Sequence, residues 1–271
     1  MQKEPITFVG GGNMGGAIIE GLLRAGWKTS DISVVELSLE RRNALQKLFP
    51  GINASEAIGP CTSAVIAVKP GGAVETCAAL SNAGATRILS IAAGVSASAL
   101  QNAAGAHTSV VRAMPNTPAL IGEGMAAICA TESTSEEVMQ WAELILGAVG
   151  KVVRVPESLI DAVTAISGSG PAYIFLVAEA LTSAAIEQGL SAEVANTLVR
   201  QLFVGSAQLL SQSPESPEQL RANVTSPNGV TAAAIATLEA TGLRDAISQT
   251  VKSAVQRSRE MLFDNFFDED V

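Results

Sequence analysis

Short runs of apolar residues alternate with longer amphipathic stretches over the first 155 residues of the chain. Apolar runs of four or five residues predict buried strands, and apolar residues that recur every three or four positions predict helices. Strands that alternate with helices indicate βαβ crossovers and a mainly parallel sheet. The strands predicted in this way cover residues 6–9, 32–35, 64–68, 87–91, 109–112, 126–130 and 152–155. Helices are predicted between several of them, the first two at residues 13–26 and 38–49.

The pattern changes after Pro156, and no further strand is predicted. Many helical positions in this part are apolar on more than one face, and such helices must be covered on more than one side. A helical bundle, or helices shared between subunits, is therefore favoured over a single surface layer. The helices predicted here cover residues 158–166, 171–188, 191–211, 217–222, 230–240 and 243–261.

Composition and charge narrow the choice of function. Hydrophobic residues make up 48% of the 271 residues and charged residues 16%, which is typical of a folded protein. The formal net charge is −9, and the sequence has no basic cluster, so we expect no nucleic-acid partner.

Cysteine and histidine usage bears on compartment and metal chemistry. Cys61, Cys77 and Cys129 form no CxxC pair, so we expect neither a disulfide framework nor a zinc site, and we expect a cytoplasmic location. The single histidine, His107, lies in a turn-like segment and is expected at the surface, which leaves no metal site.

Membrane contact is not expected either. The N-terminus lacks the pattern of a signal peptide. The most apolar later window, residues 172–186, contains Glu179. It is shorter than the ~18–20 apolar residues that a membrane span needs.

Residues 10–15, Gly-Gly-Gly-Asn-Met-Gly, fit the G-x-G-x-x-G pattern between a predicted strand and a predicted helix. In this pattern Gly10 permits the tight turn, Gly12 lets a diphosphate approach the backbone, and Gly15 lets helix and strand pack closely. The free N–H groups at the helix start then suit the diphosphate of a dinucleotide. An ordinary glycine-rich turn is the alternative, and the strand–turn–helix context favours the dinucleotide.

Charged residues near the next two strand ends bear on the cofactor. Glu36 ends the second predicted strand, where a carboxylate accepts hydrogen bonds from the adenine ribose and repels a 2′-phosphate, which favours NADH over NADPH. Arg41 and Arg42 leave this choice open, because they either bind a phosphate or form a solvated helix face with Glu40. Lys69 either offsets cofactor or substrate charge or faces solvent.

Six motifs, in their order along the chain, resemble those of pyrroline-5-carboxylate reductases. The resemblance covers residues 5–261, and the last two motifs are the most specific. They are Gly-Gly-Gly-Asn-Met-Gly at 10–15, Ala-Val-Lys-Pro at 67–70, Ser-Ile-Ala-Ala-Gly at 90–94, Arg-Ala-Met-Pro-Asn-Thr-Pro at 112–118, Ser-Gly-Ser-Gly-Pro-Ala-Tyr at 167–173 and Asn-Val-Thr-Ser-Pro-Asn-Gly-Val-Thr at 223–231.

The resemblance implies an α/β N-terminal Rossmann-type domain at residues 1–157 that binds NADPH or NADH. It also implies an all-α C-terminal dimerisation and substrate domain at residues 158–262, and the acidic tail 263–271 is expected to be disordered. Members of this family form interlocked homodimers, and five dimers commonly form a homodecamer. The implied reaction is the last step of proline biosynthesis, in which hydride transfer to a cyclic imine reduces 1-pyrroline-5-carboxylate to L-proline.

The resemblance also implies the site residues, and none of them is a metal ligand. Thr231 is the expected catalytic residue, because it lies close to the ring nitrogen of the substrate in the family. The residues expected to bind the substrate are Ser226, Pro227, Asn228, Gly229, Val230 and Thr231. Those expected to bind the cofactor are Gly10, Gly12, Asn13, Met14, Gly15, Glu36, Val68, Lys69, Pro70, Ala93, Gly94, Met114, Pro115 and Asn116.

Several alternatives stay open. The family often has glycine where Asn228 stands, but asparagine tolerates left-handed backbone angles, so we expect the turn to persist. Alternatively, Ser226 or Asn228 only caps the following helix. A hydroxyacid dehydrogenase would need a lysine on the helix at 171–188, which has none. A non-catalytic dinucleotide-binding protein, with the tail as its contact segment, would differ by its lack of turnover.

Overall fold

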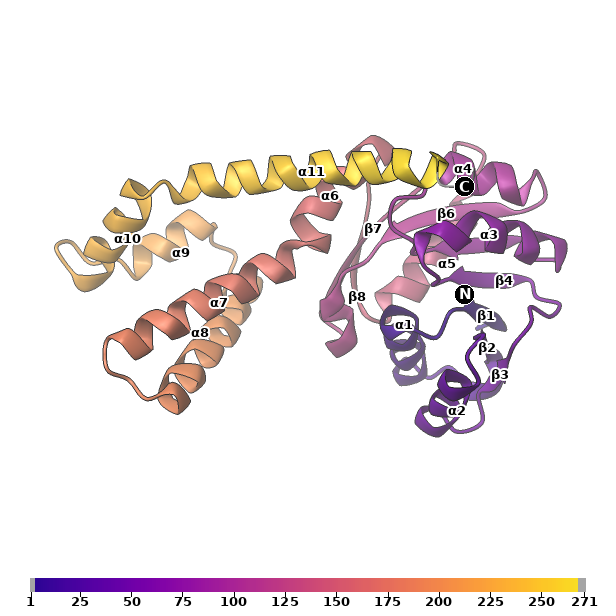
Figure 1. Ribbon diagram of the computed structural model, residues 1–271, viewed down its shortest axis with the longest axis horizontal. Coiled ribbons are helices and arrows are strands. Elements are labelled where there is room, and N and C mark those ends of the chain that lie inside the picture. Colours follow the sequence, from indigo (N-terminus) through magenta and orange to yellow (C-terminus); the bar gives the residue numbers. More distant parts are fainter. Residues whose placement is uncertain (1–2, 268–271) are drawn as a thin grey trace. The chain divides into compact units, whose positions relative to one another are not determined.

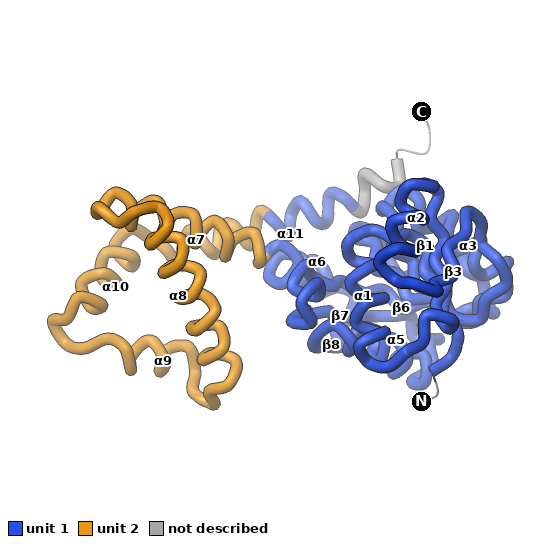
Figure 2. Tube along the Cα trace, turned by 90° about the horizontal axis from the view of Figure 1, so that it is seen from below, with its two compact units in different colours: residues 1–169, 254–271 blue, residues 170–253 orange. Residues whose placement is uncertain are grey.

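The structure is a computed structural model that describes the backbone of residues 3–267 and the side chains of residues 3–261. Two compact units divide the described chain (Figure 2). Unit 1 contains residues 3–169 and 254–267, and unit 2 contains Gly170–Ser253.

Unit 1 is built on an eight-stranded sheet with the strand order β3-β2-β1-β4-β5-β6-β7-β8 (Figure 1). All neighbouring strands are parallel except β6 and β7. The predicted α/β class with a mainly parallel sheet is therefore confirmed, and each predicted strand is present with its ends shifted by at most two residues. The strands are β1 Ile6–Val9, β2 Ile32–Val35, β3 Asn53–Ser55, β4 Ser63–Ile66, β5 Arg87–Ser90, β6 Ser109–Met114, β7 Gly124–Ala130 and β8 Gly150–Arg154.

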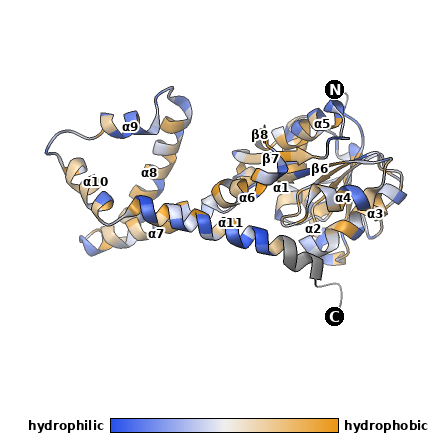
Figure 3. Cartoon of the chain, turned by 90° about the horizontal axis from the view of Figure 1, so that it is seen from above, coloured by the Kyte–Doolittle hydropathy of each residue, from blue (hydrophilic) through white to orange (hydrophobic). Residues whose placement is uncertain are grey.

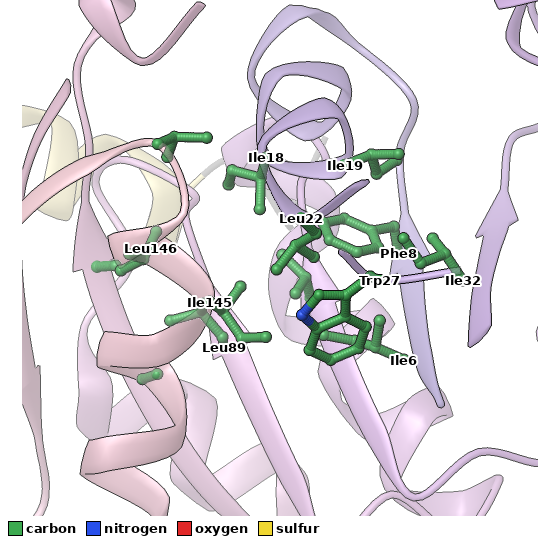
Figure 4. Close-up of a cluster of buried hydrophobic side chains, with 14 of the residues drawn as sticks. Ile6, Phe8, Ile18, Ile19, Leu22, Trp27, Ile32, Leu89, Ile145 and Leu146 are labelled. Carbon is green, nitrogen blue, oxygen red and sulfur yellow. The ribbon is translucent and has the colours of Figure 1, made fainter. Parts of the chain in front are cut away.

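Helices cover both faces of the sheet. Strand residues alternate between the two faces, so Phe8 packs in one core and Val9 in the other. Figure 4 shows the first core, where helices α1 and α5 meet the sheet. Helices α3 and α4 form the second. The helices of unit 1 are α1 Asn13–Arg24, α2 Leu39–Leu48, α3 Ala73–Asn82, α4 Ala97–Ala104, α5 Glu136–Gly147 and α6 Ile160–Val163, followed by a π-helical segment, η5, at Thr164–Gly168.

The division between the units falls later than the expected domain boundary at 157/158. Ile160 of α6 is buried against Ala127 and Cys129 of β7, which groups the first helical residues with the sheet. Near the C-terminus, the Ser258 hydroxyl donates a hydrogen bond of 2.7 Å to Asp161 of α6. Residues 268–271 of the expected tail lie outside the described residues, and the backbone of 263–267 continues the last helix.

Unit 2 is entirely helical, and its first four helices match the predicted segments to within one residue. Only Ala195 and Val199 are buried within it. Figure 3 shows apolar residues along α8 and α10, and Phe175 and Leu176 of α7 are more than 60% exposed. The apolar faces of this unit therefore need cover from outside the unit. Its helices are α7 Gly170–Glu187, α8 Ala192–Gln212, α9 Pro217–Asn223, α10 Val230–Ala240 and the first part of α11 Leu243–Phe267.

A helical run of 31 residues, Glu157–Glu187, is long and apolar enough by length and composition to cross a membrane. This run includes α6, η5 and α7, and Asp161 and Glu179 interrupt its apolar residues, so the expectation of no membrane contact stays a prediction. A helix that is covered by a second protein chain meets the same two criteria.

The first core gives a test of what stabilises unit 1. Leu22 on α1 is fully buried, whereas Leu48 on α2 is 66% exposed. We expect Leu22→Ala to lower the free energy of unfolding by about 2–5 kcal/mol, because it leaves a cavity in the core. The matched Leu48→Ala should change it by less than about 0.5 kcal/mol. Urea unfolding followed by the fluorescence of the buried Trp27 and Trp141 measures both, and equal losses would contradict this assignment of the core.

Candidate cofactor and substrate sites

The turn between β1 and α1 depends on two glycines that leave no room for a side chain. Gly10 has φ +100°, and a Cβ atom there would lie 2.4 Å from the carbonyl oxygen of Ala67 on the neighbouring segment. A Cβ atom at Gly15 would lie 2.6 Å from the carbonyl oxygen of Gly10. As the motif predicts, Gly10 therefore permits the tight turn, and Gly15 lets the helix pack closely against the strand.

Gly12 differs, because a Cβ atom there would meet nothing within 4 Å. Gly12 is also the N-cap of α1, and no side chain of the described residues caps this helix. The first N–H groups of a helix have no partner within it, and they carry the positive end of its dipole. An open, uncapped helix start of this kind fits an anion such as a diphosphate.

Several other helices differ from α1, because a side chain caps their N-terminus. Serine N-caps accept a hydrogen bond from the N–H three residues later at the starts of five helices: Ser38 (α2), Ser96 (α4), Ser135 (α5), Ser191 (α8) and Ser216 (α9). Helices α1, α3 and α10 have a glycine N-cap instead, and no side chain of the described residues caps them. The chain therefore leaves uncapped the two helix starts that the sequence assigns to anions.

Glu36 follows β2 and is held by the backbone. Its carboxylate accepts hydrogen bonds from the N–H of Gly11 at 3.3 Å and of Ser38 at 3.1 Å. Two carboxylate oxygens have about four acceptor positions, so Glu36 keeps positions for ribose hydroxyls. The contact with Gly11 places this carboxylate beside the glycine turn.

The two arginines that the sequence left open have different surroundings. Arg42 donates hydrogen bonds to the carbonyl oxygens of Glu36 and Leu37, at 2.7 and 2.8 Å, and pairs with Glu56 at 3.2 Å. Its side chain is 13% exposed, so it stabilises this loop and is not a solvated face. Arg41 has no ion-pair partner among the described residues, and it lines the cavity beside the loop.

This cavity has a volume of about 720 Å³ and brings together Gly10, Gly12, Glu36, Val68 and Lys69 of the expected cofactor residues. It lies at the carboxyl ends of β1, β2 and β4, where ligands bind in open parallel sheets. Residues that sequence reasoning missed also line it. The most relevant are Leu37, Glu56, Ile58, Thr76 and Ala79.

The other expected cofactor residues do not line this cavity. Asn13, Met14 and Gly15 form the first turn of α1, and Pro70 begins a short 3₁₀ helix after β4. Because β4, β5 and β6 are parallel, the segments that follow them reach the same edge of the sheet. These segments contain Ala93 and Gly94 after β5, Met114 at the end of β6, and Pro115 and Asn116 beyond it.

The side chain of Asn116 bonds within the protein. Its amide nitrogen donates to Ser167, and its amide oxygen accepts a hydrogen bond from the N–H of Met125. Ser167 belongs to the Ser-Gly-Ser-Gly-Pro-Ala-Tyr motif at residues 167–173. The structure thus connects two of the six motifs directly.

The expected substrate segment lies in unit 2, at the start of α10. Asn228 has φ +57° and is the one non-glycine residue with positive φ among those described, so asparagine does sustain the turn. Gly229 is the N-cap of α10, and no side chain caps this helix. The alternative in which Ser226 or Asn228 caps it is therefore wrong. A Cβ atom at Gly229 would lie 2.3 Å from the Ser226 hydroxyl oxygen and 3.1 Å from the Ser226 carbonyl oxygen, so a side chain there would displace the Ser226 hydroxyl.

Val230 and Thr231 follow as the first two residues of α10. Val230 is 90% exposed, and Thr231 is partly buried. The segment thus presents backbone N–H groups and one hydroxyl without any cationic side chain of its own, an arrangement suited to a carboxylate.

The cysteines offer no reactive thiolate. Burial raises the pKa of Cys77 to about 12 and is the main cause that raises the pKa of Cys129 to about 11. Burial also raises the pKa of Cys61. All three are free thiols, and no group of three or more histidine, cysteine, aspartate or glutamate side chains that could hold a metal is found within residues 3–261.

Comparisons with known proteins support this arrangement over both units. A family model described as pyrroline-5-carboxylate reductase dimerisation matches residues 157–261, and one described as NADP oxidoreductase, coenzyme F420-dependent, matches residues 5–94. The pyrroline-5-carboxylate reductase of Haemophilus influenzae is 40% identical over 268 residues, which cover 96% of this chain and 98% of that protein.

Solved structures agree. A pyrroline-5-carboxylate reductase from Coxiella burnetii has a TM-score of 0.90 at 35% identity, covering 96% of this chain and 99% of the other. The Plasmodium falciparum pyrroline carboxylate reductase, solved with NADP bound, has a TM-score of 0.82 at 28% identity, covering 97% and 99%. With similarity of this extent over nearly its whole length, the chain belongs to the pyrroline-5-carboxylate reductase family.

Proposed function

We propose that this chain reduces 1-pyrroline-5-carboxylate to L-proline with a reduced nicotinamide cofactor, in the final step of proline biosynthesis. One observation carries the proposal: the full-length family match includes both the open glycine turn of unit 1 and the uncapped start of α10 in unit 2. The family makes the protein an oxidoreductase that uses a nicotinamide cofactor.

The residues of unit 1 fit such a cofactor. The uncapped N–H groups of α1 at Asn13, Met14 and Gly15 would hold its diphosphate, with open space at Gly12. Glu36 would accept from the adenine ribose, and Lys69 would offset phosphate charge. Residues after the next strands would lie along the rest of the cofactor: Val68, Pro70, Ala93, Gly94, Met114, Pro115 and Asn116. When bound, the reduced nicotinamide supplies the hydride.

The residues of unit 2 fit the substrate. The segment Ser226, Pro227, Asn228, Gly229 and Val230 would bind the substrate carboxylate at the start of α10, and the Thr231 hydroxyl would hydrogen-bond to the ring nitrogen. A protonated imine is already electrophilic, so the chain has to orient the ring and needs no strong acid there. The reaction therefore requires no histidine as an acid, which is consistent with a chain that has one histidine in 271 residues.

The proposal includes a preference for NADH over NADPH. Two carboxylates, Glu36 and Glu56, line the cavity at the expected ribose position, and both would repel a 2′-phosphate. The guanidinium group of Arg42 already bonds to the carbonyl oxygens of the loop and pairs with Glu56, so it is not available to bind that phosphate. Arg41 and Lys69 are the cationic side chains that line this cavity.

We further propose that a second copy covers the apolar faces of unit 2. The dimerisation family model matches this part of the chain, and the apolar side chains of α7 and α8 are mostly exposed. The proposed assembly is an interlocked homodimer, and a pentamer of dimers is its larger form. A cytoplasmic location is part of the proposal, supported by three free cysteines.

Turnover tests the function directly. The purified chain should oxidise NADH when pyrroline-5-carboxylate is added, with formation of proline, and the absorbance of the reduced cofactor follows the reaction. If neither NADH nor NADPH is consumed while the cofactor still binds, the chain is a dinucleotide-binding protein without this activity.

Cofactor preference is tested at Glu36. We expect Glu36→Ala to shift the ratio of kcat/KM for NADPH to that for NADH about tenfold towards NADPH, equivalent to about 1.4 kcal/mol of relieved repulsion. As a control, Glu40→Ala, at an exposed position in the first turn of the following helix α2, should leave the ratio unchanged. A ratio that moves equally in both variants would mean that Glu36 does not face the ribose.

The hydroxyl at the start of α10 is tested separately. We expect Thr231→Ala to lower kcat/KM for pyrroline-5-carboxylate about ten- to a hundredfold, the range for loss of one hydrogen bond to a charged group. Thr231→Ser should retain most activity. Thr237→Ala removes a hydroxyl on the same helix that bonds to the carbonyl of Ala233, and it serves as control. An unaltered kcat/KM in Thr231→Ala would remove the hydroxyl from the reaction.

A further inference from the structure

Asn116 makes three hydrogen bonds with its side-chain amide. The nitrogen donates to the carbonyl oxygen of Ser167 at 3.1 Å and to its hydroxyl oxygen at 3.2 Å, and the oxygen accepts from the N–H of Met125 at 2.8 Å. A carboxamide has two N–H donors and one oxygen. The protein itself therefore uses the groups with which Asn116 would contact a cofactor.

The Ser167 carbonyl has a particular need for this donor. In an α-helix it would accept from the N–H of residue 171, but that residue is Pro171, which has no N–H. Ser167 also lies in the π-helical segment η5, where the Ser169 N–H donates to the Thr164 carbonyl at 2.8 Å. Such segments are rare and frequently lie at functional sites. Asn116, two residues beyond β6, thus supplies a side-chain donor where Pro171 cannot supply the α-helical one.

The end of β6 also packs against η5, next to the hydrogen bonds between Asn116 and Ser167. A Cβ atom at Gly168 would lie 2.6 Å from the terminal methyl carbon of Met114, so the Met114 side chain packs directly on the backbone of η5. Met114 is the last residue of β6, and Met125 lies at the start of β7. Through one amide, Asn116 fixes these two strands and η5 to one another.

We propose that Asn116 is a positioning residue that acts through Ser167. It holds η5 against the end of β6, and it thereby fixes the Met114 side chain at the edge of the sheet where the cofactor is proposed to lie. Its role in turnover rests on the proposed function, but the hydrogen bond to Ser167 does not. On this view the loss of the donor alone affects the chemical step and spares cofactor binding.

Asn116→Asp removes only the donor. The new carboxylate still accepts from the Met125 N–H, but its second oxygen faces the Ser167 carbonyl, and two acceptors repel each other. At neutral pH we expect kcat to fall about tenfold, the effect of about 1.4 kcal/mol, while the Kd for NADH changes less than about twofold. Asn102→Asp, on the exposed face of α4, makes the same charge change and should leave both values native.

Two readouts separate positioning from a merely structural defect. The neighbouring carbonyl oxygen raises the pKa of the new carboxyl group, and its protonated form is again a donor, so kcat relative to native should recover as the pH falls through that pKa. Pro171→Ala returns a backbone N–H to the Ser167 carbonyl. We expect the double variant Asn116→Asp/Pro171→Ala to regain most of the lost kcat, and it carries the test if the single variant fails to fold.

Hydrogen exchange gives a measurement independent of turnover. We expect amides of residues 164–172 to exchange faster in Asn116→Asp than in the native chain, and to slow again in the double variant. An Asn116→Asp variant with native kcat overturns the proposal. A tenfold higher Kd for NADH at native kcat also overturns it, because that result would mean that Asn116 contacts the cofactor directly. A double variant that recovers none of the lost kcat overturns it as well. Absence of turnover in the native chain would refute the proposed function, and exchange at residues 164–172 would still report on the Ser167 bond.

Discussion

The parallel sheet of unit 1 is the constraint on which the cofactor site depends. Its central strands β1 and β4 are buried along their whole length, because helices cover both faces. Parallel strands run in one direction, so the glycine turn after β1, Glu36 after β2 and Lys69 after β4 all reach the same edge. Gly10 and Lys69, which lie more than 50 positions apart in sequence, thus line one cavity because of the direction of their strands.

Unit 2 depends on a different condition, since it cannot bury its own apolar surface. With Ala195 and Val199 as its buried residues, its helices are placed mainly by short loops and by whatever covers their faces. The substrate segment at the start of α10 belongs to this unit. If a second copy supplies the cover, as we propose, the stability of the unit that carries this segment depends on association.

Sequence patterns predicted the strands and helix starts that neighbouring residues determine. They missed the features that depend on residues far apart in the sequence. Apolar runs located seven strands, but β3 is the polar segment Asn53–Ser55, so Glu56 beside it was missed as part of the cavity. Only its place between α2 and β4 in the βαβ order signals that strand. The start of α10 was predicted correctly, because a glycine and a turn-forming asparagine mark it. The partners of Asn116 could not be predicted, since Ser167 lies 51 residues away.

The uncapped starts of α1 and α10 would let a chain of net charge −9 hold the two anions of the proposed reaction. Binding a diphosphate and a carboxylate with lysine and arginine side chains would need clustered cations, which this sequence lacks. The backbone N–H groups that follow Gly12 and Gly229 provide partial positive charge that does not count in the net charge. At the starts of five other helices, serine side chains accept hydrogen bonds from such N–H groups. A glycine at the N-cap costs only a few tenths of a kcal/mol relative to serine, and it leaves the first N–H groups of the helix open. At α1 and α10 the proposed anion sites would therefore cost the chain little stability.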